Sequence, residues 1–327
     1  MRHPYLIRLD EPEDWLDVHE DRDPRTGELV EEQHDILWPE GSDQLYEFND
    51  SYFYTSTTYH EHSTGWETFF IHSGSMDLYA RGKVATADAG DILFIPPYTA
   101  HKMTMLTKPV VWNGLFHGVG LLRTINDWAL ILKSNPQMLD DPEVKANYLG
   151  NKTNILRENP PYAKRVSKDD MHEIRPYDKP FEVCDFPGVS MRQYTGRWEN
   201  NGKTELWLAE LQKGFKVRYV NTNPNVDLFY ILSGEVKFDI AGEKFVAGPR
   251  CLVKAPSFAP RSFETLSEVK MYDAGGSTHW LDLFGDLSSL KTSSPELLSD
   301  SAYVKGIKKR HECCVESAVF EGRELFF

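Results

Sequence analysis

The sequence lacks several features that define whole classes of protein. Its four cysteines, Cys184, Cys251, Cys313 and Cys314, form no CxxC motif or other paired spacing. Such scattered cysteines favour free thiols in a reducing compartment. No stretch approaches the roughly 18 apolar residues that a membrane span requires, and the opening MRHPYLIRLD has no apolar signal segment. We therefore expect a cytoplasmic protein that does not enter a membrane.

Basic charge is also scarce. The chain has 50 acidic and 36 basic residues, a net charge of −14, which would repel nucleic-acid backbones and anionic membrane surfaces. Much of this charge lies between Asp10 and Asp35, where twelve acidic residues face only Arg22 and Arg25. We interpret residues 1–44 as an acidic leader that lies on the surface of the protein.

Short predicted strands dominate the rest of the chain. They are evenly spaced, with glycine and proline at the corners, and this pattern predicts an all-β sandwich or barrel. Two stretches, ETFFIHSGSMDLYARG and DLFYILSGEVKFDIAG, share an acidic residue, an aromatic run and a Ser-Gly corner, which indicates an internal duplication. We expect five segments: the leader 1–44, a first β unit 45–133 closed by a short helix, an irregular connecting arm 134–181, a second β unit 182–290 and a tail 291–327.

The first β unit carries a pattern of candidate metal ligands. His60 and His62 are two residues apart, so in a strand their imidazoles share one face. Glu67 begins the next strand, and His101 follows the Pro96 corner on a strand that returns beside them. Three imidazoles and one carboxylate suit a divalent ion of iron, manganese, nickel, copper or zinc. An octahedral ion bound by four protein ligands keeps two coordination positions open for chemistry.

These residues resemble the two motifs of the cupin family. The first motif is matched in spacing by His60, His62, Glu67 and Gly74, and the second by Gly90, Pro96 and His101. The chain departs from the family pattern without losing a ligand at three positions: Tyr54, Tyr98 and Met105. The resemblance implies two tandem cupin barrels, also called double-stranded β-helices or jelly rolls, of which only the N-terminal one keeps an intact metal motif.

The second repeat lacks this ligand set. Counting back from Gly234 as from Gly74 places Asp227 at the glutamate position, and Val220 and Thr222 at the two histidine positions. Aligning the proline corners places Arg261 where His101 stands. Because arginine cannot bind a cation as a ligand, we expect no metal here. We hypothesise that Asp227 and Arg261 form an ion pair in its place; the alternative is that one or both point to solvent.

Other residues are weaker candidates for the site. Strand alternation predicts that the substrate pocket is lined by Tyr54, Ser56, Thr58, Phe69 and Met103, together with Ile71 and Met105. Trp112 is a further pocket candidate, without an argument from alternation. For the apolar members, the alternative is ordinary barrel core. Alternation turns His72 away from the metal. Pocket or anion-binding roles for Trp66, His117, Arg81 and Arg123 have little support.

Three classes of function remain open. The pattern of one intact and one degenerate barrel resembles metal-dependent cupin dioxygenases, in which Fe(II) gathers O₂ and a small phenolic, diketone or keto acid. With Mn, Ni, Zn or Cu the same ligands suit a lyase, isomerase or decarboxylase. The third class is a non-enzymatic binding protein. No nucleotide-binding glycine loop and no evident Ser-His-Asp or Cys-His set competes with the metal motif. The resemblance also implies a homodimer.

Overall fold

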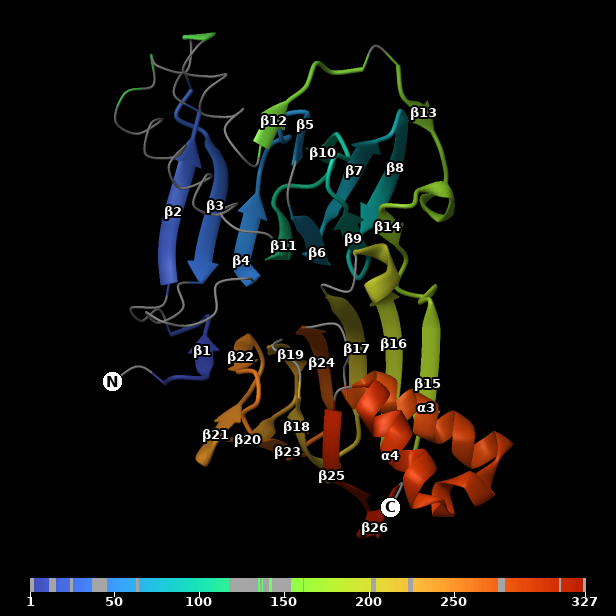
Figure 1. Ribbon diagram of the computed structural model, residues 1–327. Helices are drawn as coiled ribbons and strands as arrows, with labels where there is room; N and C mark the ends of the chain where they lie inside the picture. Colours follow the sequence, from blue (N-terminus) through green and yellow to red (C-terminus); the bar gives the residue numbers. More distant parts are fainter. Residues whose placement is uncertain are drawn as a thin grey trace. The chain divides into compact units, whose positions relative to one another are not determined.

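The chain forms two compact units, residues 14–179 and residues 1–13 with 180–327. The computed structural model describes residues 3–11, 16–23, 26–36, 46–62, 65–117, 135, 137, 141–142, 154–160, 162–200, 204–222, 226–275, 280–311 and 313–325. The helix expected at the end of segment 45–133 lies outside these residues, as does Arg123. Each unit is described by itself (Figure 1).

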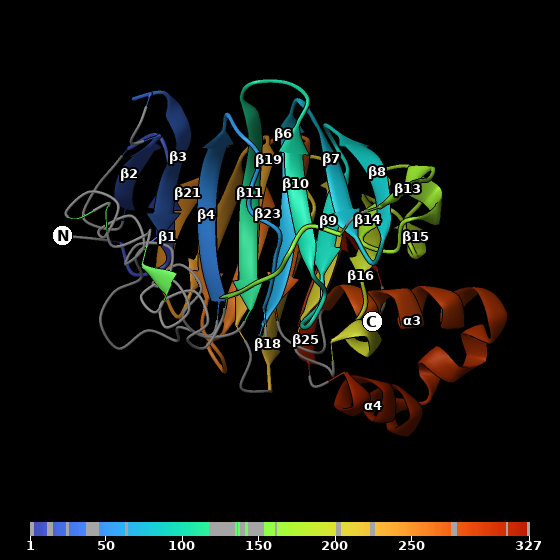
Figure 2. The ribbon, with the colours of Figure 1, turned by 90° about the horizontal axis from the view of Figure 1, so that it is seen from above.

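The unit of residues 14–179, here the first barrel, consists of two facing sheets. The seven-stranded sheet has the order β14 (Ile174–Arg175), β9 (Ile92–Ile95), β6 (Trp66–Ser73), β11 (Val110–His117), β4 (Tyr46–Phe53), β3 (Leu29–Ile36) and β2 (Leu16–Arg22). The six-stranded sheet has the order β12 (Asn154–Leu156), β5 (His60–His62), β10 (His101–Met105), β7 (Ser75–Ala80), β8 (Lys83–Asp88) and β13 (Lys164–Arg165). Figure 2 shows β4, β11 and β6 side by side, as their pairing requires.

The other unit, the second barrel, repeats this plan. Its seven-stranded sheet has the order β1 (Leu6–Arg8), β22 (Cys251–Ala255), β19 (Asp227–Ser233), β24 (Val269–Gly275), β17 (Glu205–Leu211), β16 (Val189–Thr195) and β15 (Glu182–Phe186). Its six-stranded sheet has the order β21 (Glu243–Ala247), β20 (Val236–Ile240), β23 (Arg261–Thr265), β18 (Lys216–Asn221), β25 (Cys313–Phe320) and β26 (Arg323–Glu324). The 3-10 turns are η2 (Lys168–Asp170), η3 (Arg197–Glu199) and η4 (Pro295–Ser299).

The strand orders confirm the internal duplication. In the seven-stranded sheets, β14, β9, β6, β11, β4, β3 and β2 correspond in order to β1, β22, β19, β24, β17, β16 and β15. The Ser-Gly corners also correspond: Gly74 has φ of 87° and Gly234 has φ of 83°. A Cβ at either glycine would lie within 2.3 Å of another atom, so both the backbone angle and the space require glycine.

The interior of each barrel follows the period-2 pattern of its strands. Strand β10 alternates buried and half-buried side chains along its length, as expected for a strand with one face on the core. In the first barrel the core combines side chains from both sheets, including Phe69, Trp112, Leu78 and Met103. The second barrel has a larger aromatic core around Trp207, Phe238 and Trp280. The described chain is therefore mainly β, as the sequence predicts.

The ends of the chain take a larger part in the fold than expected. Segment 1–44 is not a separate leader, because β1 pairs with β22 and β3 pairs with β4. Helix α3 (Trp280–Ser293) begins within the expected second β unit, and the tail supplies α4 (Ser301–Arg310) and β25, which pairs with β18. All four cysteines are free thiols. Among the described helices, none combines the length and the apolar character needed to cross a membrane.

Candidate metal centre

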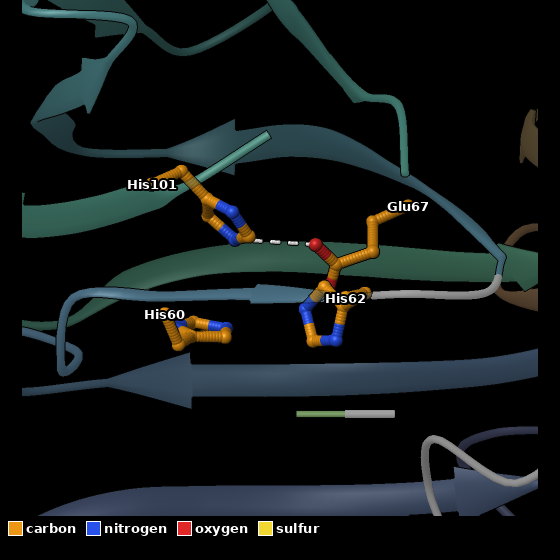
Figure 3. Close-up of side chains that lie close together, drawn as sticks. All are labelled: His60, His62, Glu67 and His101. Atoms are coloured by element: carbon orange, nitrogen blue, oxygen red, sulfur yellow. Dashed lines mark ion pairs between the residues drawn. The ribbon is translucent and has the colours of Figure 1, made fainter. Parts of the chain in front are cut away.

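The four predicted ligands come from three strands in the two sheets of the first barrel. His60 and His62 lie on β5, and His101, on β10, is directly opposite His60. Glu67 lies on β6 of the facing sheet, where it is opposite Ile95. One ligand atom of each side chain lies within 4.8 Å of those of the others (Figure 3). His62, Glu67 and His101 are buried, and His60 is half-buried.

Backbone carbonyl groups orient two of the imidazoles. His60 Nδ1 lies 2.9 Å from the carbonyl oxygen of Thr58, and His101 Nδ1 lies 2.9 Å from that of Thr99. A carbonyl oxygen only accepts, so in each ring Nδ1 carries the hydrogen and Nε2 keeps a free lone pair. This is the arrangement that fixes the tautomer and orientation of a metal-binding histidine. The sequence analysis missed these two carbonyls, because a backbone acceptor has no residue-type signal.

The ligand atoms of the histidines lie close to the carboxylate of Glu67. His101 Nε2 lies 3.2 Å from Glu67 Oε2, and His62 Nε2 lies 3.1 Å from Glu67 Oε1. Although buried, His101 Nε2 and Glu67 Oε2 form no hydrogen bond. Buried polar atoms without partners are costly, and a cation among them would satisfy every lone pair at once.

The electrostatics favour a neutral imidazole at His60 and an ionised carboxylate at Glu67. The pKa of His60 is lowered to about 3, chiefly by burial and also by the neighbouring imidazoles of His101 and His62. Burial alone would raise the pKa of Glu67, but the imidazoles of His62 and His101 outweigh it and hold that pKa well below its usual range. Neutral imidazole and carboxylate are the forms that bind a metal.

The donor set therefore fits a divalent transition metal. Three neutral nitrogen donors and one carboxylate oxygen can bind iron, manganese or zinc, and the residues that would hold the ion are His60, His62, Glu67 and His101. Elsewhere in the described part of the chain, no other group of three or more histidine, cysteine or acidic side chains converges in this way.

The expected pocket residues separate into two sets. Residues 54–59 lie outside the strands, so alternation does not apply to Tyr54, Ser56 and Thr58; Ser56 and Thr58 are exposed, and Tyr54 is half-buried. Thr57 instead bonds to the backbone of Met103. Phe69, Met103 and Trp112 are buried in the barrel core, together with Ile71 and Met105.

The remaining candidate residues are not members of the metal-ligand group. His72 contacts Asn113 through its Nε2 atom. Arg81 donates to the buried Glu173 at 2.6 Å and to Thr99 Oγ1 at 3.2 Å, so it supports the corner that carries His101. Trp66 is half-buried, and the side chain of His117 lies outside the described set.

Comparison with known proteins agrees with this geometry. Residues 54–116 match the family model described as "Cupin domain". No curated protein sequence matches the chain. The fold of the chain is that of a bicupin.

Three similar solved structures illustrate the range of this fold. The oxalate decarboxylase of Lactobacillus farciminis, solved as a formate complex, has a TM-score of 0.56 at 12% identity and covers 94% of this chain and 97% of its own. The Bacillus subtilis oxalate decarboxylase, whose Mn(II) centres are described, has a TM-score of 0.54 at 13% identity, covering 86% and 79%. The salicylate 1,2-dioxygenase of Pseudaminobacter salicylatoxidans has a TM-score of 0.54 at 11% identity, covering 74% and 75%.

The second barrel of this bicupin carries a different set of residues at the same four positions. His60 is opposite His101 in the first barrel, and Tyr219 is opposite Arg261 in the second. His62 follows His60 by two residues on β5, and Asn221 follows Tyr219 by two residues on β18, so Asn221 corresponds to His62. The histidine positions are thus occupied by Tyr219 and Asn221, whereas Val220 and Thr222 were expected from the sequence.

The expected ion pair in the second barrel is confirmed. Arg261 Nη1 donates to Asp227 Oδ2 at 2.7 Å, and both side chains are buried. Asp227 also accepts from Tyr219 Oη at 2.7 Å and from Asn221 Nδ2 at 2.8 Å. Burial alone would lower the pKa of Arg261, but the carboxylate of Asp227 outweighs it and raises that pKa. The guanidinium therefore takes the place of a cation, and among the described residues of this barrel no group of metal-ligand side chains converges.

Proposed function

We propose that this bicupin is a mononuclear dioxygenase that binds Fe(II) in its first barrel and acts on a small phenolic, diketone or keto acid. The observation that carries the proposal is the convergence of three imidazoles and one carboxylate with lone pairs facing one another. Such a set leaves two adjacent positions on an octahedral ion for other ligands.

The surroundings of Glu67 support an organic substrate with apolar surface. Phe116, on β11, is directly opposite Glu67 on β6, and its ring packs edge to face on Phe69. Trp112 packs on Phe69 in the same way. These rings exclude water and favour an aromatic or aliphatic body beside the ligands.

The protein residues hold and orient the reactants in this proposal. Iron held by His60, His62, Glu67 and His101 would supply the redox chemistry between O₂ and the substrate. His60 and His101, with their Nδ1 hydrogens held by backbone carbonyls, keep their Nε2 atoms directed at the ion. Glu67 lowers the net charge of the centre. The substrate supplies the electrons that reduce O₂ in this proposal.

A non-redox reaction is the second candidate. The oxalate decarboxylases are similar to this chain over most of its length, and one of them is described with Mn(II) centres. The same four ligands could hold Mn(II), which as a Lewis acid would polarise a carboxylate and support decarboxylation.

Oxygen consumption separates the two candidates. The protein, reconstituted with Fe(II) or Mn(II), is incubated with a panel of phenols, diketones and keto acids, and with oxalate. An oxygen electrode and CO₂ release are followed together. The dioxygenase proposal expects stoichiometric O₂ uptake with the iron form, and none with the His62→Ala variant.

The contrary result is equally clear. If the manganese form releases CO₂ from a substrate without O₂ uptake, the function is decarboxylation and the dioxygenase proposal is wrong. Full activity of His62→Ala would contradict any reaction at this centre. His172→Ala is the matched control, because His172 is an exposed histidine of the same unit and should leave activity unchanged.

We also propose a cytoplasmic homodimer. Four free thiols, two of them buried, suit a reducing compartment. Size-exclusion chromatography with light scattering would test the dimer.

A further inference from the structure

The metal-ligand carboxylate shares its sheet face with a wall of polar side chains. Strand pairing connects Glu67 to Phe116, Phe69 to Gly114 and Asn49, and Asn49 to Asp35. Ser51 is in turn opposite both Trp112 and Gln33. Directly opposed residues point to the same face. The polar wall, defined as Gln33, Asp35, Asn49 and Ser51, therefore faces the barrel interior, as Glu67 does.

Two members of the polar wall present buried atoms that have no partner. Gln33 Nε2 donates to Asp35 Oδ1 at 2.8 Å, and this contact fixes which end of the amide faces the carboxylate. Gln33 Oε1 and Ser51 Oγ are buried and form no hydrogen bond. Both residues are fully buried at 0% exposure, a state in which an unsatisfied polar atom is costly. These two atoms lie on neighbouring strands at directly opposed positions.

Asn49 is held in place by a glycine. Its Oδ1 accepts from the backbone N–H of Gly114 at 2.8 Å. A Cβ at position 114 would lie 2.4 Å from that oxygen and 2.7 Å from the ring of Phe116. The glycine thus allows the polar wall to stand directly beside the aromatic side chains that flank Glu67.

The second barrel does not conserve this wall. By the same strand pairing, Gln33, Asp35, Asn49 and Ser51 correspond to Met191, Gln193, Trp207 and Ala209. Met191, Trp207 and Ala209 belong to the apolar core of that barrel. A polar interior therefore accompanies the metal-ligand group and is mostly replaced by core packing where that group is lost.

The charge of this face restricts what it can bind. From β3 through β4, β11 and β6 to β9, the described ionisable side chains on the face are Glu31, Asp35 and Glu67, all acidic. The unpartnered amide oxygen of Gln33 is also an acceptor, and the Ser51 hydroxyl can accept. Hydrogen-bond donors are therefore favoured, and a second carboxylate on the ligand is repelled.

We propose that Gln33, Asp35 and Ser51 bind the end of the substrate that is remote from the metal, and that this end carries hydroxyl groups or a protonated amine. The inference rests on the proposed function, since it takes the group around Glu67 as the reaction centre. Strand β4 is separated from β6 by β11, and β3 lies one strand further, so across the sheet Ser51 lies about 10 Å from β6 and Gln33 and Asp35 lie about 14 Å from it. A substrate that spans the two has an aromatic or aliphatic body with a donor at its far end. Small dianions are disfavoured.

A matched series of phenols tests this proposal by binding alone. The probes are tyramine, 4-ethylphenol and 3-(4-hydroxyphenyl)propanoate, which place a cation, a methyl group and an anion at similar distances from the same phenol. Calorimetry with the folded, metal-loaded chain is expected to show tyramine bound roughly tenfold more tightly than 4-ethylphenol, with the anion weakest. Asp35→Asn should remove most of the tyramine advantage, and Ser51→Ala should weaken tyramine and leave 4-ethylphenol unchanged.

Glu32→Gln is the control, because Glu32 neighbours Gln33 on β3 but is opposite Tyr52, on the other face of the sheet. It should leave all three affinities unchanged. Equal affinities for the three probes, no binding of any, or an unchanged preference in Asp35→Asn would each overturn the proposal. Metal content and O₂ uptake are measured on the same samples. A preference for tyramine without turnover would contradict the proposed reaction alone. Turnover without the preference would contradict only the proposed binding role of the polar wall.

Discussion

The two barrels of this bicupin use the same four positions in opposite ways. In the first barrel the positions hold His60, His62, Glu67 and His101, where His60 and His101 present Nε2 lone pairs beside a carboxylate. In the second they hold Tyr219, Asn221, Asp227 and Arg261, in which three donors surround one carboxylate. The second set satisfies itself, whereas the first needs a cation from outside. The balance of donors and acceptors, with the fold held constant, decides whether a barrel binds metal.

The largest expected effect is on the stability of the second barrel. Asp227→Ala leaves the buried guanidinium of Arg261 without its carboxylate, and we expect a loss of about 3–5 kcal/mol in the free energy of unfolding. Denaturant unfolding, with hydrogen exchange to resolve the two barrels, measures it. The double variant Asp227→Ala/Arg261→Leu should recover much of the loss, because both charges are then gone. A loss below about 1 kcal/mol for the single variant would show that the Asp227–Arg261 ion pair does not stabilise the second barrel as proposed.

The corresponding change in the first barrel should act on metal affinity and leave the fold intact. His101→Ala removes one of four ligands, and we expect metal affinity to fall by more than the roughly 100-fold that loss of a residue hydrogen-bonded to a metal ligand can cost. Elemental analysis after dialysis against a metal buffer measures the loss. Arg261→Leu, at the equivalent position of the second barrel, should keep the metal. Loss of metal in that variant would mean that the ion lies in the other barrel.

Acid should also distinguish the barrels. The pKa of His60 is lowered to about 3, so in the metal-free fold this imidazole stays neutral while an unfolded histidine takes up a proton below about pH 6.5. Its contribution is therefore present above pH 6.5 and is lost as the pH falls towards 3. We expect the metal-free first barrel to lose about 1–2 kcal/mol between pH 7.5 and 5 through this group.

His60→Gln serves as the control for the acid experiment, since glutamine does not titrate. Hydrogen exchange at the two pH values would show the difference between the wild type and this variant over β5 and β10. An equal loss in both proteins would assign the acid sensitivity to other groups.

Sequence reasoning reached the ligand group because its spacing is local. His60, His62 and Glu67 lie within eight residues; strand alternation puts His60 and His62 on one face, and the spacing of the cupin motif adds Glu67. The same reasoning failed by one position in the second barrel. Five residues separate Asn221 from Asp227, whereas four separate His62 from Glu67, so counting from the shared glycine shifts the alignment. Only the strand pairing shows the difference.

Long-range pairing accounts for the other departures. The acidic segment before residue 45 has charges typical of a surface leader, yet its strands β1 and β3 complete sheets whose other members lie far along the chain. The polar wall was missed for this reason. Gln33 and Asp35 lie within that acidic segment, and only their register with Ser51 and Asn49 places them on the interior face.

The ratio of metal to protein chains tests this account most directly. Anaerobically purified, folded protein, incubated with Fe(II) or Mn(II) and then desalted, is analysed for transition metals alongside His101→Ala. We predict one ion per chain in the wild type and none in the variant. A wild type that takes up no ion, or a variant that retains a full equivalent, would contradict the assignment of the metal to the four side chains of the first barrel.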